Sequence, residues 1–391
     1  MAGPLAGIRV IDLTHMLAGP MATMMLADQG AEVIKIEPPH HGDPGRSRGR
    51  PIGMAPGFAM LGRNKRSVVI DLKQRRGVEL LYRLIERADL FVQNFRPGTA
   101  ERLGLGEPEL RRIKPDLVYV SISGFGESGP LAHKRAYDPV IQAAAGVASI
   151  QGDRASGRPR MVRVIVSDKV TALTAAQAMT AALFARQRSG EGQHVRLAML
   201  DAVLSFLWPE EMDNYTYPDS DHFNKLNVRD LVYETADGYI TMAAIGDDEW
   251  RATCRALGHP EWLDDPRFRT QADRIANADE RFDLTGQALK TRSSAEWLGI
   301  LDREQVPCAP ILSPAQVIED AQVRHNRLVV EYQHPMAGRT RQTRPAARFE
   351  RTPQEIRHPA PTLGQDTDEV LGELGVSREE LAALRAAGVL G

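Results

Sequence analysis

The sequence predicts an α/β protein whose first half forms a Rossmann-like, doubly wound domain. Short β-branched runs alternate with helical patterns over this half, and apolar residues make up 42% of the 391-residue chain. Such alternation is typical of βαβ units around a largely parallel sheet. The apolar share is that of an ordinary globular protein, and the length allows two or three domains.

Six short runs predict the strands of the sheet. We expect strands at 8–13, 31–37, 67–72, 90–94, 117–123 and 193–198, with helices or helical turns at 19–28, 75–87 and 108–113. A long alanine-rich helix follows Asp168 and should end near Arg188, because the Ser-Gly-Glu-Gly sequence at 189–192 supplies a stop signal. Asp168 stands where a strand-like run gives way to this helix, so local context alone predicts an N-cap.

After residue 207 the sequence loses the regular pattern of strands and helices. Residues 208–232 are polar and aromatic without periodicity, which predicts a linker. A smaller α+β domain is expected over 233–328, beginning with two strands around an Asp-Gly turn and continuing with helices that carry Trp250, Trp262 and Trp297. Residues 329–391 predict a return connection and an amphipathic helical tail with a capping box formed by Ser377 and Glu380. The first domain is therefore expected over 1–207, and the tail should rejoin it.

Composition excludes several classes of protein. With 49 basic and 51 acidic residues, the net charge of −2 is too balanced for binding nucleic acid through the overall field. Cys254 and Cys308 cannot form a disulfide framework or a thiolate zinc cluster, and His40-His41 has no partner spaced for a metal, so we expect a metal-free protein of the reducing cytoplasm. The longest uncharged run, 170–185, is shorter than the ~20 residues of a membrane span, and no signal peptide is expected.

Residues 61–76 form the most basic segment. Six cations (Arg63, Lys65, Arg66, Lys73, Arg75 and Arg76) face one acid, Asp71, for a local charge of +5. Such a cluster either holds the phosphates of a ligand or lies in water, since charge runs usually face solvent. Arg96 and Arg102 follow the next strand, at the edge of a parallel sheet where ligands normally bind. A polyphosphate ligand therefore fits the pattern.

The sequence GFGESG at 124–129 has the glycine spacing of a dinucleotide-binding motif. That motif requires a helix to open at its third glycine, but here Pro130 and a polar segment follow. A glycine-rich turn is therefore favoured, and an NAD(H)-binding module remains an alternative.

Collinear blocks along nearly the whole chain resemble the class III coenzyme A transferases of the CaiB/BaiF type. They read LAGIRVIDLTHMLAGPMATMMLADQGAEVIKIEPPHHGD, GRNKRSVVIDLK, NFRPG, GFGESGP, YDPVIQAAAG, SDKVTALTAAQAMTAAL, GQHVRLAMLDAV and PAPTLGQDTDEVLGELG. The resemblance implies a large Rossmann-type domain built from both chain ends, a small domain between them, and two chains interlocked as a homodimer. It also implies coenzyme A and acyl-CoA as substrates, a small carboxylic acid as partner, and no tightly bound cofactor.

By the same resemblance, Asp168 matches the catalytic aspartate, which forms a mixed anhydride with the acyl group and then an aspartyl-CoA thioester. The positions implied to contact CoA are His15, Met16, Leu17, Ala18, Ile70, Asp71, Leu72, Lys73, Asn94, Phe95, Arg96, Arg102 and Arg135, together with Tyr137 and Asp138. Arg63 and Lys65 either brace this set or lie in solvent. At Pro38 the chain departs from relatives that place an arginine against the nucleotide.

The superfamily also contains α-methylacyl-CoA racemases, so a 2-methylacyl-CoA racemase is the alternative activity. Those enzymes use a histidine before an aspartate some thirty residues ahead of the catalytic aspartate. Here Tyr137 occupies that position, and a phenol with a pKa near 10 is a poor base at neutral pH. The transferase is favoured; His133, more simply an exposed loop residue, is the group that would support the racemase.

The acid substrate is less defined by the sequence. Oxalate-specific relatives carry a run of consecutive glycines that is missing between Phe223 and Tyr239, which argues against formyl-CoA and oxalate. Dicarboxylates such as succinate, hydroxy acids, carnitine-like acids and aromatic acids stay open. Arg46, Arg48 and Arg50 either meet a second carboxylate or are solvated.

Overall fold

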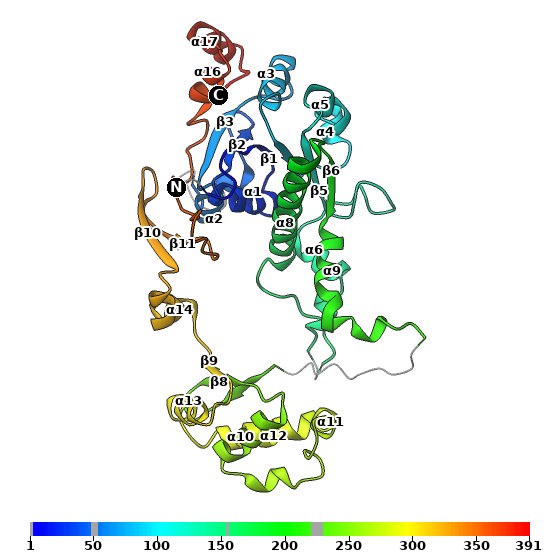
Figure 1. The fold of residues 1–391 in the computed structure, drawn as a ribbon, viewed down its shortest axis with the longest axis vertical. Coiled ribbons are helices and arrows are strands. Elements are labelled where there is room, and N and C mark those ends of the chain that lie inside the picture. The colour runs from blue at the N-terminus through cyan, green and yellow to red at the C-terminus, as the bar shows by residue number, and fades with distance from the viewer. Residues whose placement is uncertain (1–2, 48–53, 154–155, 220–229) are drawn as a thin grey trace. The chain divides into compact units, whose positions relative to one another are not determined.

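The computed structural model describes residues 3–47, 54–153, 156–219 and 230–391. Its contacts divide the chain into two compact units, each described here by itself. The large unit comprises Met1–Pro218 with Arg327–Gly391, and the small unit comprises Asp219–Asn326 (Figure 1). The large unit therefore contains both ends of the chain.

A six-stranded, wholly parallel sheet forms the centre of the large unit. Its strands are β1 (Arg9–Leu13), β2 (Glu32–Glu37), β3 (Lys65–Val69), β4 (Leu90–Gln93), β5 (Val118–Ser123) and β6 (His194–Ala198), in the spatial order β3-β2-β1-β4-β5-β6. This order is that of doubly wound dinucleotide-binding folds. All six predicted strands are confirmed, but β3 lies earlier than expected, because the backbone N–H of Asp71 already bonds to Val389 O at 2.8 Å, in the tail of the chain.

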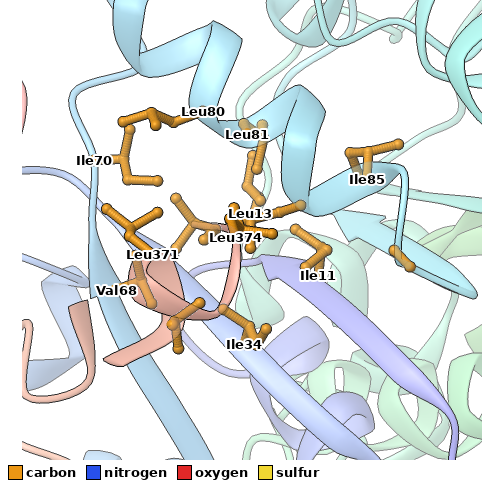
Figure 2. Close-up of a cluster of buried hydrophobic side chains, with 14 of the residues drawn as sticks. Ile11, Leu13, Ile34, Val68, Ile70, Leu80, Leu81, Ile85, Leu371 and Leu374 are labelled. Atoms are coloured by element: carbon orange, nitrogen blue, oxygen red, sulfur yellow. The ribbon is translucent and has the colours of Figure 1, made fainter. Parts of the chain in front are cut away.

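The helices of the large unit cover both faces of the sheet. They are α1 (Ala18–Asp28), η1 (Pro44–Ser47), α2 (Pro56–Leu61), α3 (Arg75–Ile85), α4 (Thr99–Arg102), α5 (Glu107–Ile113), α6 (Asp138–Ala144), α7 (Val147–Ile150), α8 (Val166–Ser189), α9 (Met199–Glu211), η2 (Asp213–Tyr215), α16 (Thr367–Glu373) and α17 (Arg378–Ala386). Alternate residues of β1 point to opposite faces, as in any strand. Ile11 and Leu13 join a core with α3 and α16 (Figure 2), to which α17 also contributes, whereas Val10 joins a second core with α1 and α8.

Helix α8 corrects the predicted position of Asp168. The helix begins at Val166 with Ile165 as its N-cap, so the predicted N-cap is wrong and Asp168 is the third residue of the first turn. At the other end, Gly190 has a φ of 75° and terminates the helix, as the stop signal predicted. The left-handed conformation favours glycine because it has no Cβ.

Part of the predicted 208–232 linker is also helical. Helix α9 continues to Glu211 through a kink at Pro209 and is followed by the short η2 turn. Leu207 packs in a core with Ile141 and Val170, and this tertiary contact sustains a helix that has no periodicity beyond Trp208. Residues 220–229 of the linker lie outside the described part of the chain.

The C-terminal segment returns to the large unit. An antiparallel hairpin of β10 (Val329–His334) and β11 (Gly338–Thr343) precedes α16 and α17. The carboxylate of Asp366 accepts a hydrogen bond from Ser67 N at 2.7 Å, which ties this segment to the edge strand β3. Of the predicted capping box, only the serine half is observed: Ser377 Oγ accepts from Glu380 N at 3.2 Å.

The small unit combines a three-stranded antiparallel sheet with helices. Its elements are β7 (Val232–Glu234), β8 (Tyr239–Met242), α10 (Asp247–Leu257), η3 (Pro260–Leu263), α11 (Gln271–Ala276), α12 (Ala278–Leu289), α13 (Ser294–Arg303), β9 (Cys308–Pro310), α14 (Pro314–Glu319) and α15 (Ala321–His325). The predicted hairpin around the Asp-Gly turn is confirmed, and Trp250, Trp262 and Trp297 pack in one core. Within the described ranges of the whole chain, every helix is too short or too polar to cross a bilayer.

Candidate functional site

The loops after β1 and β4 meet where the winding of the sheet reverses. Helix α1 follows β1 onto one face of the sheet, and α4 and α5 follow β4 onto the other. His15 N donates to Asn94 Oδ1 at 2.8 Å, and Asn94 Nδ2 donates to His15 O at 2.9 Å. The rings of His15 and Phe95 lie 5.3 Å apart. Two of the segments expected to contact CoA are thus joined at the position where doubly wound sheets bind ligands.

The loop after β1 is held in an unusual conformation. Met16 has a φ of 72°, and its N–H donates to Asp43 Oδ1 at 3.2 Å. Lys35 Nζ donates to Thr14 O at 2.7 Å and pairs with Asp43 at 2.9 Å. A Cβ on Gly19 would lie 2.4 Å from Thr14 Cβ, so the close approach of α1 to this loop requires glycine. These contacts fix the backbone N–H groups at the start of α1.

Asp168 lies against this helix start. Its Oδ1 accepts a hydrogen bond from Ala18 N at 3.2 Å, so a carboxylate from the first turn of α8 contacts the first residue of α1. The first N–H groups of a helix have no partner inside it, and the helix dipole favours negative charge there by about 0.3–1 kcal/mol at exposed sites. The half-buried Asp168 carboxylate therefore belongs to an environment suited to anions.

The neighbouring Asp138 is buried, and its carboxylate accepts hydrogen bonds from other residues of the protein. Its side chain is 7% exposed, and its two oxygens accept from Ser167 N and Gln142 Nε2, both at 2.7 Å. Ser167 is the residue before Asp168, so Asp138 caps the first turn of α8 from another helix. Tyr137, by contrast, is 64% exposed. The two residues of the predicted pair thus face different environments.

Buried charges support the floor of the site. Asp12 and Lys65 pair at 3.0 Å, and Thr23 Oγ1 donates to Asp12 Oδ2 at 2.7 Å. Burial opposes ionisation of Asp12, but Lys65 and Lys35 outweigh it and lower the pKa of this carboxyl. Burial likewise opposes the charge of Lys35, and Asp12 and Asp43 more than compensate, so the pKa of Lys35 is raised. Lys35 was missed in the sequence, although a lysine inside the apolar run of β2 is a signal of a buried ion pair.

Arg46 is neither solvated nor available for a substrate carboxylate. It is 4% exposed, pairs with Glu37 at 2.6 Å and stacks on the ring of Phe58 at 3.9 Å. Burial opposes ionisation of Glu37, but Arg46 and Lys35 lower its pKa. Both alternatives considered for Arg46 are therefore wrong. Arg48 and Arg50 lie outside the described residues.

The cations of the basic segment 61–76 form two groups in the structure, one paired with acids and one exposed. Arg63 pairs with Asp28 at 2.6 Å and Lys65 with Asp12, all four being buried. Neither cation lies in solvent, so that alternative is wrong, and the bracing of the CoA-contacting residues stays a prediction. The cause is tertiary, because the acidic partners come from α1 and β1. Arg66 likewise binds acids, Glu32 at 2.7 Å and Glu373 at 2.8 Å, which leaves Lys73, Arg75 and Arg76 exposed.

The other predicted CoA positions follow β3, β4 and β5 at the carboxyl edge of the sheet. Ile70 is 1% exposed and belongs to the core, and Asp71 Oδ1 accepts from Lys73 N at 3.0 Å. The side chains of Lys73, Arg96, Arg102 and Arg135 are exposed, as is that of His133. Leu72, which precedes Lys73 in the chain, is half-buried, and so is Leu17 in the loop after β1. The edge thus offers cations, with apolar side chains next to them in the chain.

The glycine-rich segment 124–129 does not start a helix. Gly126 and Gly129 have φ values of 98° and 91°, and the next helix, α6, begins only at Asp138. This confirms the glycine-rich turn. The helix N-terminus that a pyrophosphate requires at the third glycine is missing from this described stretch.

Comparison with known proteins agrees with these features. The model of CoA-transferase family III matches residues 5–367. Over 378 residues, the chain is 34% identical to the succinyl-CoA:glutarate CoA-transferase of Mus musculus, covering 95% of this chain and 86% of that protein. It is also 34% identical to the formyl-CoA:oxalate CoA-transferase of Streptomyces coelicolor, covering all of both.

Solved structures show the same fold. A CaiB/BaiF family protein from Brucella suis superposes with a TM-score of 0.82 at 30% identity, covering 96% of this chain and 100% of that one. Rv3272 from Mycobacterium tuberculosis gives a TM-score of 0.82 at 31% identity, covering 94% and 98%. Taken with the parallel sheet and its loops, these matches show that the chain belongs to CoA-transferase family III and is a CoA-transferase.

Proposed function

We propose that this enzyme moves CoA from an acyl-CoA donor to a free carboxylic acid through covalent intermediates on Asp168. The observation that carries the proposal is the hydrogen bond of 3.2 Å from Ala18 N to Asp168 Oδ1. It joins a carboxylate to the loop that begins after β1, where the fold binds ligands. Asp168 thus places a half-buried carboxylate at the start of α1, next to the loop expected to contact CoA.

The proposed exchange has four balanced steps. A carboxylate oxygen of Asp168 attacks the thioester carbonyl, and the CoA thiolate leaves, which forms a mixed anhydride. The thiolate then attacks the Asp168 carbonyl, forms an aspartyl-CoA thioester and releases the donor acid. The acceptor carboxylate attacks this thioester, expels the thiolate and forms a second anhydride. Attack of the thiolate on the acceptor carbonyl gives the new acyl-CoA and restores Asp168.

The start of α1 supplies the electrostatic support for these steps. Negative charge develops on a carbonyl oxygen in each attack, and preorganised backbone N–H groups stabilise such charge. The N–H of Ala18 already contacts the Asp168 carboxylate, and the contacts of Met16 and Thr14 hold this segment still. We assign Ala18 N–H as a donor to the oxyanion formed on the Asp168 carboxyl.

The exposed cations at the sheet edge are proposed to hold the phosphates of CoA. Lys73, Arg96, Arg102 and Arg135 follow the strands β3 to β5, and charge-assisted hydrogen bonds to phosphate are the strongest that such side chains make. Asn94 and Phe95, joined to His15, would border the nucleotide. For the acceptor, the glutarate in the name of one relative makes dicarboxylates the first acids to assay. Oxalate, named for another relative, is assayed with them to test the argument from the missing glycine run.

Trapping tests the covalent step. The enzyme is incubated with an acyl-CoA and no acceptor, treated with hydroxylamine or borohydride, and digested for mass spectrometry. We expect the modification on Asp168, and a loss of transfer of at least about 10³-fold in the Asp168→Ala variant with CoA affinity within about twofold of the parent. The matched control is Asp201→Ala, an exposed aspartate on α9. Full turnover in Asp168→Ala would refute the mechanism.

The alternative activity has its own readout in the same samples. A racemase exchanges the α-proton of a 2-methylacyl-CoA with solvent, so deuterium from heavy water enters the substrate. The exposed phenol of Tyr137 stands where that reaction needs a histidine, and we therefore expect no incorporation. Deuterium exchange without CoA transfer would reverse this conclusion.

A further inference from the structure

The small unit contains a cavity whose wall residues have no part in the transfer mechanism proposed above. Its volume is about 130 Å³, and it lies between the β7–β8 hairpin and helices α10 and α12. Its wall includes the side chains of Tyr233, Met242, Trp250, Thr253, Arg281 and Thr285. All of them belong to the small unit, so the cavity does not depend on how the two units are placed.

Arg281 brings an uncompensated positive charge to this cavity. Its guanidinium makes a single long hydrogen bond, 3.5 Å to Ala244 O, and no ion pair with any described residue. Burial and the nearby Arg274 lower the pKa of Arg281. Arg274 is balanced, because it binds the carboxylate of Asp247. A partly buried cation without a counter-ion is unfavourable, and proteins normally pair such groups.

Trp250 forms part of the cavity wall and reports on its occupancy. The residue is 3% exposed, and its indole N–H has no hydrogen-bond partner among the described residues. Leu231, Met242 and the ring of Tyr233 make the rest of the wall mainly apolar. The cavity therefore combines the positive charge of Arg281 with mainly apolar walls.

We propose that this cavity binds a small organic carboxylate, with Arg281 as its ionic partner and the apolar wall, which includes the Trp250 ring, around its short chain or ring. A guanidinium matches the two oxygens of a carboxylate. The volume is about four times the ~30 Å³ that a water molecule occupies in the liquid, which suits an acid of a few carbon atoms. Free phosphate matches the charge but not the apolar wall, so it should bind more weakly.

The site is tested by nuclear magnetic resonance on the full-length protein with ¹⁵N-labelled tryptophan. The four tryptophans give four indole N–H signals, and Trp250→Phe identifies the one from the cavity. Butyrate, glutarate and benzoate are titrated separately, with inorganic phosphate for comparison. We expect at least one carboxylate to shift the Trp250 signal saturably and more strongly than phosphate does. A Trp250 signal that no carboxylate shifts, or that phosphate shifts as much, overturns the proposal.

Substitutions separate this site from the transfer reaction. Arg281→Met should weaken carboxylate binding at least about tenfold, and Arg281→Lys, which keeps the charge, should weaken it less. The matched control is Arg251→Met, an exposed arginine of α10 outside the cavity wall, which should bind like the parent. Unchanged binding in Arg281→Met contradicts the assignment. Asp168→Ala should retain the Trp250 shift, so a failed transferase mechanism leaves this test intact.

Discussion

At the scale of single residues, the site depends on side chains that hold the backbone in place. Asp43 accepts from Met16 N at 3.2 Å and from Gly45 N at 2.7 Å, and Asp138 accepts from Ser167 N at 2.7 Å. Neither carboxylate needs to touch the substrate to matter, because a displacement of about 1 Å at a reacting group costs roughly 10²-fold in rate. We therefore assign Asp138 as a positioning residue for Asp168.

Substitution of Asp138 tests this assignment. Asp138→Ala removes the cap from the first turn of α8, so we expect kcat for CoA transfer to fall at least about tenfold while KM for acyl-CoA changes less than about twofold. Asp138→Asn keeps one oxygen for Ser167 N but places an amide against Gln142 Nε2. Its kcat should therefore lie between those of the parent and Asp138→Ala. Steady-state kinetics check this order. A rise in KM with unchanged kcat would instead make Asp138 a direct CoA contact.

The lowered pKa of His15 makes the stability of the folded protein depend on pH. Burial and the charge of Lys35 lower its pKa from 6.5, so the folded chain binds this proton less tightly than the unfolded chain. Stability is therefore complete above about pH 6.5 and falls as the pH drops toward the folded pKa, by at most about 1.4 kcal/mol per pH unit.

Urea denaturation between pH 7.5 and about 5.5 measures the contribution of His15 to stability. This pH range lies above the pKa of ~4 that carboxyl groups ordinarily have. Glu37 and Asp43, whose pKa values are lowered, lose their contributions only below it. The free energy of unfolding should depend less steeply on pH in His15→Gln than in the parent. Equal slopes in the two proteins would contradict the assignment.

At the scale of elements, the end of strand β3 separates buried, paired cations from the exposed cations proposed to bind CoA. Lys65 lies within the strand and pairs with Asp12 of β1, and its ammonium also donates to Pro20 O at 2.9 Å in α1. Lys73 follows the strand and is exposed. Residues of one basic run in the sequence therefore have opposite environments, because the strand is buried between helices and its following loop is not.

Lys65 and Lys73 form a matched pair of substitutions. Removing one partner of a buried ion pair leaves an uncompensated charge, so Lys65→Met should lower the free energy of unfolding by about 3–5 kcal/mol with little change in CoA affinity. Lys73→Met should leave stability within about 0.5 kcal/mol and weaken CoA binding. Urea denaturation and calorimetric titration with CoA measure both quantities. The reverse pattern would show that Lys65 belongs to the CoA site.

At the scale of the whole molecule, exposed apolar side chains indicate a partner surface. Leu173 and Phe184 on α8 are 56% and 61% exposed, and Phe206 on α9 is 60% exposed. Large apolar groups gathered on a surface commonly mark protein–protein contacts. We propose that two copies of this chain associate through these helices, in the interlocked homodimer that the family resemblance implies.

Light scattering after size exclusion measures the assembly. We expect a mass of twice the 43.1 kDa of the chain, and the double substitution of Leu173 and Phe184 by glutamate should lower it toward that of one chain. The control Gln322→Glu adds a charge at an exposed position of α15, outside these helices, and should leave the mass unchanged. A parent protein with the mass of a single chain would contradict the dimer.

The alternation of apolar runs and helical patterns, by itself, determined the six parallel strands, the long helix α8 and the hairpin of the small unit, because the period of apolar residues follows local backbone geometry. The collinear motifs determined the family. Neither type of signal carries information about which distant side chains meet.

Only the tertiary structure decided the partners of the charged residues. It buried Arg63 with Asp28 and Arg46 with Glu37, placed Asp168 inside the first turn of α8, and left Arg281 without a carboxylate among the described residues. The physical reason is that the free energy of a charge depends on its burial and its counter-ion, and both are supplied by segments far away in the chain.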